Sequence, residues 1–157
     1  MGVLMDLVAG DAREILLATG VEDWAGLRDP GRFAAYISLG GRMDATWLDL
    51  FAQAVREVSG SNQPGPFTDA ARALQSRLAA LSDRTVERID PHWIDAVALL
   101  PESRLDRVAA RWIDLIDCEE CDVDTDDKPM LRELAGDLVS FCRRAEGAED
   151  VLFAWSI

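Results

Sequence analysis

The stretch Val3 to Ala9 reads VLMDLVA and is rich in valine and leucine, which favours a β-strand. Asp11 follows it and can cap a helix that ends at Gly20. At the other end of the chain, Val151 to Ile157 reads VLFAWSI and predicts a second strand. Two terminal strands with helices between them indicate an α+β fold: a helix-dominated single domain whose small sheet includes both terminal strands.

The interior of the chain is predicted to be mostly helical, from apolar stripes at helical spacing and from capping residues. The first expected helix runs from Asp44 to Gly60, with Trp47, Leu48, Phe51, Val55 and Val58 inward, and the second starts at Thr68 or Asp69 and runs to Leu81, with Ala71, Leu74, Leu78 and Leu81 on one face. The other three start at Asp90-Pro91 and stop before Pro101, run through Leu105 to Ile116, and run from Pro129 to Gly147.

Three other segments are expected to break this helical pattern. Val21 to Gly41 contains Asp-Pro-Gly and Gly-Gly, which indicate short helices and turns. Thr85 to Ile89 alternates and predicts a short strand. Ser59 to Pro66 reads SGSNQPGP, the composition of a flexible surface loop.

Length and charge limit the classes of function. The chain has 157 residues, 49% of them apolar, which suits one globular domain covering residues 1–157. At this length a fold buries about 70% of the surface of its unfolded chain, so it needs no disulfide or metal for stability. The formal net charge is −13, and phosphate contacts require a basic face, so nucleic acid is not an expected partner.

A cytoplasmic location is expected, without membrane attachment. No stretch approaches the roughly 18 consecutive apolar residues of a membrane span, and Met1 to Gly10 lacks the basic start of a signal peptide. Three cysteines, an odd number, fit a reducing compartment. Lys128 is the only lysine among 16 basic residues, a skew typical of a GC-rich bacterial genome or, in an acidic chain, of a salt-adapted organism.

The leading functional hypothesis is a non-enzymatic binding protein, such as an inhibitor or immunity-type protein, that docks a basic protein partner. Clustered carboxylates steer a cationic partner and speed its association. The residues expected to do this are Asp117, Glu119, Glu120, Asp122, Asp124, Asp126 and Asp127.

The same stretch offers a second interpretation, a Ca²⁺-responsive module. Asp122, Asp124, Asp126 and Glu133 match four ligand positions of an EF-hand loop. However, Asp127 stands where the sharp turn needs glycine. Asp126 or Asp127 capping the following helix is therefore the favoured structural explanation, and no metal or other cofactor is expected.

The remaining chemical candidates are few. Cys118 and Cys121 form a lone CxxC pair, and a zinc site would also need Cys142 and His92, which lie in separate predicted helices. Acidic neighbours disfavour ionisation of the CxxC thiols, so a redox role is not favoured. His92 is the only histidine, and no catalytic residue can be assigned. A small hydrolase or transferase that uses a carboxylate pair in a pocket stays open as an alternative.

Three segments together resemble the YfbM-like family of uncharacterised bacterial proteins. They are Met1-Gly2-Val3-Leu4 leading to Asp11, the segment Asp44 to Leu50 in which an Asp precedes Trp47 by three residues, and Ile89-Asp90-Pro91 together with Leu138 to Ile157, which contains Arg143-Arg144. Ala45 and Phe51 replace the lysine and histidine associated with the second segment. The resemblance covers most of the chain and implies an α+β fold, but the family brings no established activity.

Overall fold

The computed structural model describes residues 4–40, 43, 45–75, 77–81, 84–120 and 123–156, which form a five-stranded antiparallel sheet. Its strands are β1 (Leu4–Gly10), β2 (Ala35–Ser38), β3 (Ala71–Ala73), β4 (Thr85–Ile89) and β5 (Asp150–Ser156), in the order β2-β1-β5-β4-β3. The terminal strands β1 and β5 pair along seven positions near the middle of the sheet, which confirms the predicted α+β domain.

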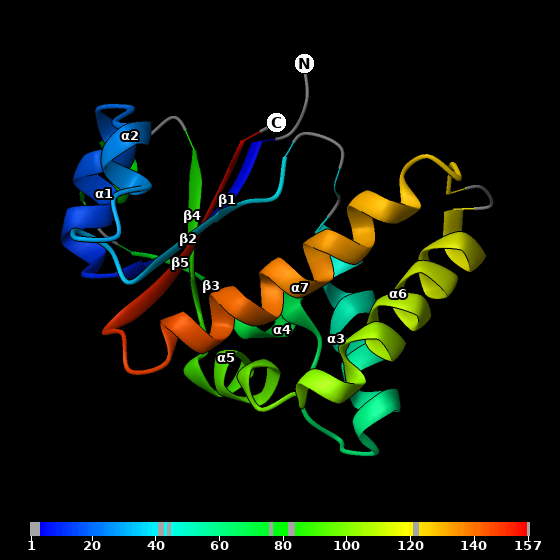
Figure 1. Ribbon diagram of the computed structural model, residues 1–157. Helices are drawn as coiled ribbons and strands as arrows, with labels where there is room; N and C mark the ends of the chain where they lie inside the picture. The colour runs from blue at the N-terminus through cyan, green and yellow to red at the C-terminus, as the bar shows by residue number, and fades with distance from the viewer. Residues whose placement is uncertain are drawn as a thin grey trace.

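Helices cover both faces of this sheet (Figure 1). One face carries α1 (Ala12–Gly20), α2 (Trp24–Leu27) and the 3₁₀ turn η1 (Ala79–Leu81). The other face carries α3 (Ala45–Ser59), α4 (Phe67–Ala70), α5 (Pro91–Ala98), the 3₁₀ turn η2 (Glu102–Arg104), α6 (Leu105–Glu120) and α7 (Lys128–Ala145). None of the described helices combines the length and hydropathy that crossing a membrane requires.

Alternation along the central strands divides the apolar residues into two cores. Successive side chains of a strand point to opposite faces. Leu7 and its partner Phe153 join the larger core beneath α3 to α7, whereas Val8 and its partner Leu152 join the smaller core beneath α1 and α2. A sheet covered on both faces explains why VLMDLVA is a nearly continuous apolar run.

The predicted helix starts at Asp11 and Asp90 are confirmed. The Asp11 carboxylate accepts a hydrogen bond from the Glu14 amide at 3.0 Å, and the Asp90 carboxylate accepts one from the His92 amide at 2.9 Å. Each bond satisfies an amide that the first helical turn leaves without a partner. The predicted cap Asp44 lies outside the described residues.

The prediction of short helices and turns for Val21 to Gly41 is only partly right. The α2 turn is there, but Ala35–Ser38 forms the edge strand β2, paired with β1. With four residues, this strand depends on its pairing with β1 more than on its own propensity.

The predicted helix from Thr68 or Asp69 to Leu81 is wrong. Only α4 is helical before the chain turns into β3, which pairs with β4. The supposed apolar stripe is divided between the two cores, because Ala71 packs on the larger one and Leu74 and Leu78 on the smaller one. A single helical face cannot contact both sides of a sheet.

Candidate functional site

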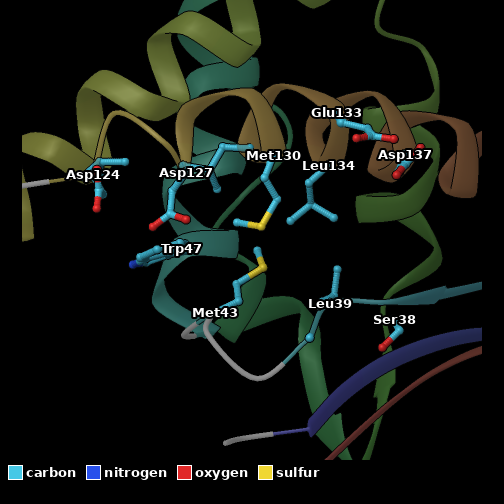
Figure 2. Close-up of a pocket in the computed structure, with 13 residues that line it drawn as sticks. Ser38, Leu39, Met43, Trp47, Asp124, Asp127, Met130, Glu133, Leu134 and Asp137 are labelled. Carbon is cyan, nitrogen blue, oxygen red and sulfur yellow. The ribbon is translucent and has the colours of Figure 1, made fainter.

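A cavity of about 650 Å³ opens between the end of β2, the start of α3 and the N-terminal half of α7 (Figure 2). We call this cavity and its rim the acidic groove. It is lined by Ser38, Leu39, Gly40, Met43, Trp47, Val123, Asp124, Asp127, Met130, Leu131, Glu133, Leu134 and Asp137. Its volume is typical of a binding site for a small molecule or a pair of side chains.

Helix α7 contributes one continuous wall. Four of its side chains share one stripe of the helix: Met130, and the residues three, four and seven positions after it, which are Glu133, Leu134 and Asp137. Leu131, one residue along, is fully buried and anchors α7 in the larger core. The same helix therefore provides both core packing and a groove wall.

The floor of the acidic groove is apolar and rich in methionine. Met43 is 4% exposed, whereas Met130 on the opposite wall is 44% exposed. Figure 2 shows their side chains pointing toward one another at the centre of the cavity, with Leu39 and Leu134 beside them. Methionine side chains are flexible and polarisable, so this floor can adapt to different apolar groups.

Trp47 forms another wall and is held by the packing of α3 on α6. The indole Nε1–H of Trp112 donates to the carbonyl of Trp47 at 2.8 Å. Trp112 is fully buried and packs edge-to-face on Phe51, with ring centroids 5.2 Å apart. These contacts fix the first turns of α3, and with them the position of Trp47.

The rim of the acidic groove is negatively charged. Asp124, Asp127, Glu133 and Asp137 lie along it, and no lysine or arginine is among the described lining residues. Glu133 and Asp137 stand one helical turn apart on α7, and neither forms an ion pair with a described residue. Like charges at this spacing repel each other and destabilise a helix by about 0.2–0.5 kcal/mol.

The structure separates the members of the acidic stretch that the sequence grouped together. Asp124 and Asp127 line the groove, whereas Asp126 and Glu119 are exposed and do not. Asp117 already has a local partner, since its carboxylate accepts a hydrogen bond from the Val123 amide at 2.8 Å. The side chain of Glu120, and all of Asp122, lie outside the described residues.

Several groove residues that were not predicted to bind a partner lie outside the acidic stretch of residues 117–127. Asp137, Met43 and Met130 carry no motif, and Glu133 was considered only as a calcium ligand. The sequence does carry a signal for the residues on α7. Met130, Glu133 and Asp137 recur at helical spacing, which places their side chains on one stripe.

Metal binding gains no support from the described residues. They contain no group of three or more His, Cys, Asp or Glu side chains arranged to hold a metal ion. The calcium interpretation also needs Asp122, which is outside them. Asp127 occupies the N-cap position of α7, as the capping explanation expects, but its side chain makes no capping hydrogen bond to the first helical turn.

The cysteines and the histidine lie in unrelated places. Cys142 is fully buried in the larger core, and burial raises the pKa of its thiol far above the usual range. Cys118 is exposed near the end of α6, and His92 is exposed in the first turn of α5. Cys121 lies outside the described residues. A shared zinc site of Cys142 and His92 is therefore not formed.

Comparison of the chain with family models, curated proteins and solved structures finds no match. The resemblance to the YfbM-like family stays a prediction.

Proposed function

We propose that this chain is a non-enzymatic binding protein that docks a basic protein partner in the acidic groove, as an inhibitor or immunity-type protein would. The observation that carries the proposal is an adaptable apolar cavity with carboxylates along its rim. Such a site suits a segment in which an apolar side chain enters the cavity while lysine or arginine side chains meet the rim.

The dimensions support a side-chain docking site. About 650 Å³ accommodates one or two large side chains, and desolvated pockets of this kind are where interface energy concentrates. Met43 and Met130 allow the cavity to adjust to its occupant. The exposed part of Met130 supplies apolar area that a partner can cover.

The charge distribution favours a cationic partner. A positive side chain near Glu133 and Asp137 would relieve their mutual repulsion, and the net charge of −13 would speed association at low ionic strength. Asp124, Glu133 and Asp137 are exposed, whereas carboxylates that act as general acids usually sit in apolar surroundings. This difference supports docking over catalysis.

The proposed location of the protein is the cytoplasm. Free thiols at Cys118 and Cys142 fit this reducing compartment.

Calorimetric titration with short capped peptides tests the ligand side of this proposal. A peptide of alternating arginine and leucine should bind, and its affinity should fall as salt is added. A peptide of arginine and glycine should bind at least about tenfold more weakly, because it leaves the apolar floor exposed.

A peptide of alternating glutamate and leucine serves as the control for apolar contact alone and should not bind measurably. Equal binding of the arginine–leucine and glutamate–leucine peptides would remove the electrostatic basis of the proposal. Equal binding of the arginine–leucine and arginine–glycine peptides would remove the role of the cavity.

A further inference from the structure

A second cavity, of about 670 Å³, lies on the other face of the sheet, between α1 and the edge formed by β3. It is lined by Ala12, Arg13, Leu16, Arg72, Ala73, Leu74, Gln75, Leu78 and Arg88. We call it the arginine groove. Three of its described lining residues are arginines and none is acidic, in a chain whose acidic residues outnumber its basic ones by 29 to 16.

Two of these arginines lie side by side on neighbouring strands of the sheet. Arg72 on β3 and Arg88 on β4 are direct cross-strand partners, so their side chains leave the same face of the sheet. Like charges in directly opposed positions destabilise a strand pair. An arrangement that breaks a local rule of stability often marks a site that serves binding.

Only one of the three positive charges is balanced by a described carboxylate. Arg88 Nε lies 2.9 Å from Asp150 Oδ1. Arg72 donates to the carbonyl of Ala71 at 3.1 Å, a neutral acceptor. Arg13 forms no ion pair with a described residue. Two positive charges therefore face the cavity without an acidic partner among the described residues.

The base of the arginine groove is apolar. Leu16 is 3% exposed and belongs to the smaller core, and Leu74 and Leu78 pack against that core from the chain that follows β3. The cavity thus joins an apolar base to a positively charged rim, and its volume is in the range of sites for metabolite-sized molecules.

We propose that the arginine groove binds a small phosphate monoester that carries an apolar group. A phosphate monoester has a charge of about −1.5 to −2 at neutral pH, which matches the two unbalanced guanidinium groups. Guanidinium groups bind phosphate oxygens through paired hydrogen bonds, and the apolar group covers the leucines. This site is independent of the acidic groove and of the protein partner proposed there.

The first test is calorimetric titration of the full chain with octyl phosphate below its micelle concentration. Octyl phosphate should bind at least about tenfold more tightly than inorganic phosphate or octanol, because only it offers both the anion and the apolar chain. It should also raise the melting temperature, as any ligand of the folded state does. Absence of heat and of a melting shift at millimolar octyl phosphate would overturn the proposal. Hexaglutamate peptide is the control for negative charge alone, and its binding as tightly as octyl phosphate would also overturn the proposal.

The second test uses Arg13→Gln and Arg72→Gln, with Arg107→Gln as the matched control. Arg107 is exposed on α6 and does not line the groove. Each groove variant should weaken octyl phosphate binding by about tenfold or more, and the control by less than about twofold. Arg72→Gln should also melt at a higher temperature than the wild type without ligand, because it removes the repulsion from Arg88.

These two effects of Arg72→Gln have opposite signs, so a general loss of structure cannot mimic them. Unchanged affinity in both groove variants, or an equal loss in Arg107→Gln, would show that the arginines do not form the site.

Discussion

Arg84 and Asp6 form a buried ion pair, in which Arg84 Nη1 donates to Asp6 Oδ2 at 2.7 Å and both side chains are 8% exposed. The other terminal nitrogen of Arg84 donates to the carbonyls of Leu4 and Ala154 at 3.0 and 2.9 Å. The guanidinium also lies over the ring of Trp24, 5.2 Å from its centroid. One side chain, immediately before β4, therefore connects β1, β5 and α2.

Asp6→Asn should lower the free energy of unfolding by about 3 kcal/mol, because it leaves the Arg84 charge buried without its carboxylate. Urea denaturation at neutral pH measures this loss. Asp114→Asn is the matched control, since Asp114 is exposed on α6, and it should change stability by less than about 0.5 kcal/mol. Equal losses in the two variants would mean that the buried pair contributes nothing specific.

Tyr36 should titrate above the usual range, and it is the only tyrosine in the chain. Burial raises the pKa of its hydroxyl from 10.0, and the charge of Asp6, which accepts the hydroxyl's hydrogen bond at 2.9 Å, raises it further. The folded state thus favours the protonated phenol. Its contribution to stability is complete below pH 10.0 and is lost as the pH rises through the folded-state pKa.

Tyrosinate absorbance during a pH titration of the folded protein reads this group alone. A midpoint above that of the urea-unfolded chain is expected, and a midpoint equal to or below it would contradict the described environment of Tyr36. Tyr36→Phe should lower the free energy of unfolding by about 1 kcal/mol at neutral pH. As the pH rises above 10.0, the variant should lose less stability than the wild type, because it has no phenol to ionise.

Cys118 and Cys142 should differ in reactivity. The thiolate is the reactive form, and burial both covers Cys142 and raises the pKa of its thiol. Iodoacetamide should modify Cys118 in the folded protein and Cys142 only after unfolding. Mass spectrometry on a Cys121→Ser background resolves the two sites. Modification of folded Cys142 as fast as Cys118 would contradict its burial.

The sequence was most informative where many residues carried one signal. The terminal strands were predicted because each is a seven-residue segment dominated by apolar side chains. β2 and β3, with four and three residues, depend on pairing with β1 and β4, which lie outside the short segment that forms each strand. For β3 the local pattern even favoured a helix, because apolar spacing cannot tell which of two cores each residue will meet.

The acidic groove was predictable only in its local part. Asp124 and Asp127 stood out because carboxylates are dense around them in the sequence. The approach of Met43 to Met130 depends on how Met43, which lies between β2 and α3, is placed against α7, and no short segment specifies this. The arginine groove depends similarly on the register that places Arg72 opposite Arg88.

The most direct measurement compares two doubly substituted variants that change net charge equally. Glu133→Gln with Asp137→Asn alters the rim of the acidic groove, whereas Glu119→Gln with Asp126→Asn removes two exposed carboxylates that do not line it. In calorimetric titration with the arginine–leucine peptide, the groove variant should bind about tenfold more weakly than the wild type, and the other variant less than about threefold. Equal losses in the two variants would show that only diffuse charge attracts the peptide and would contradict docking in the groove.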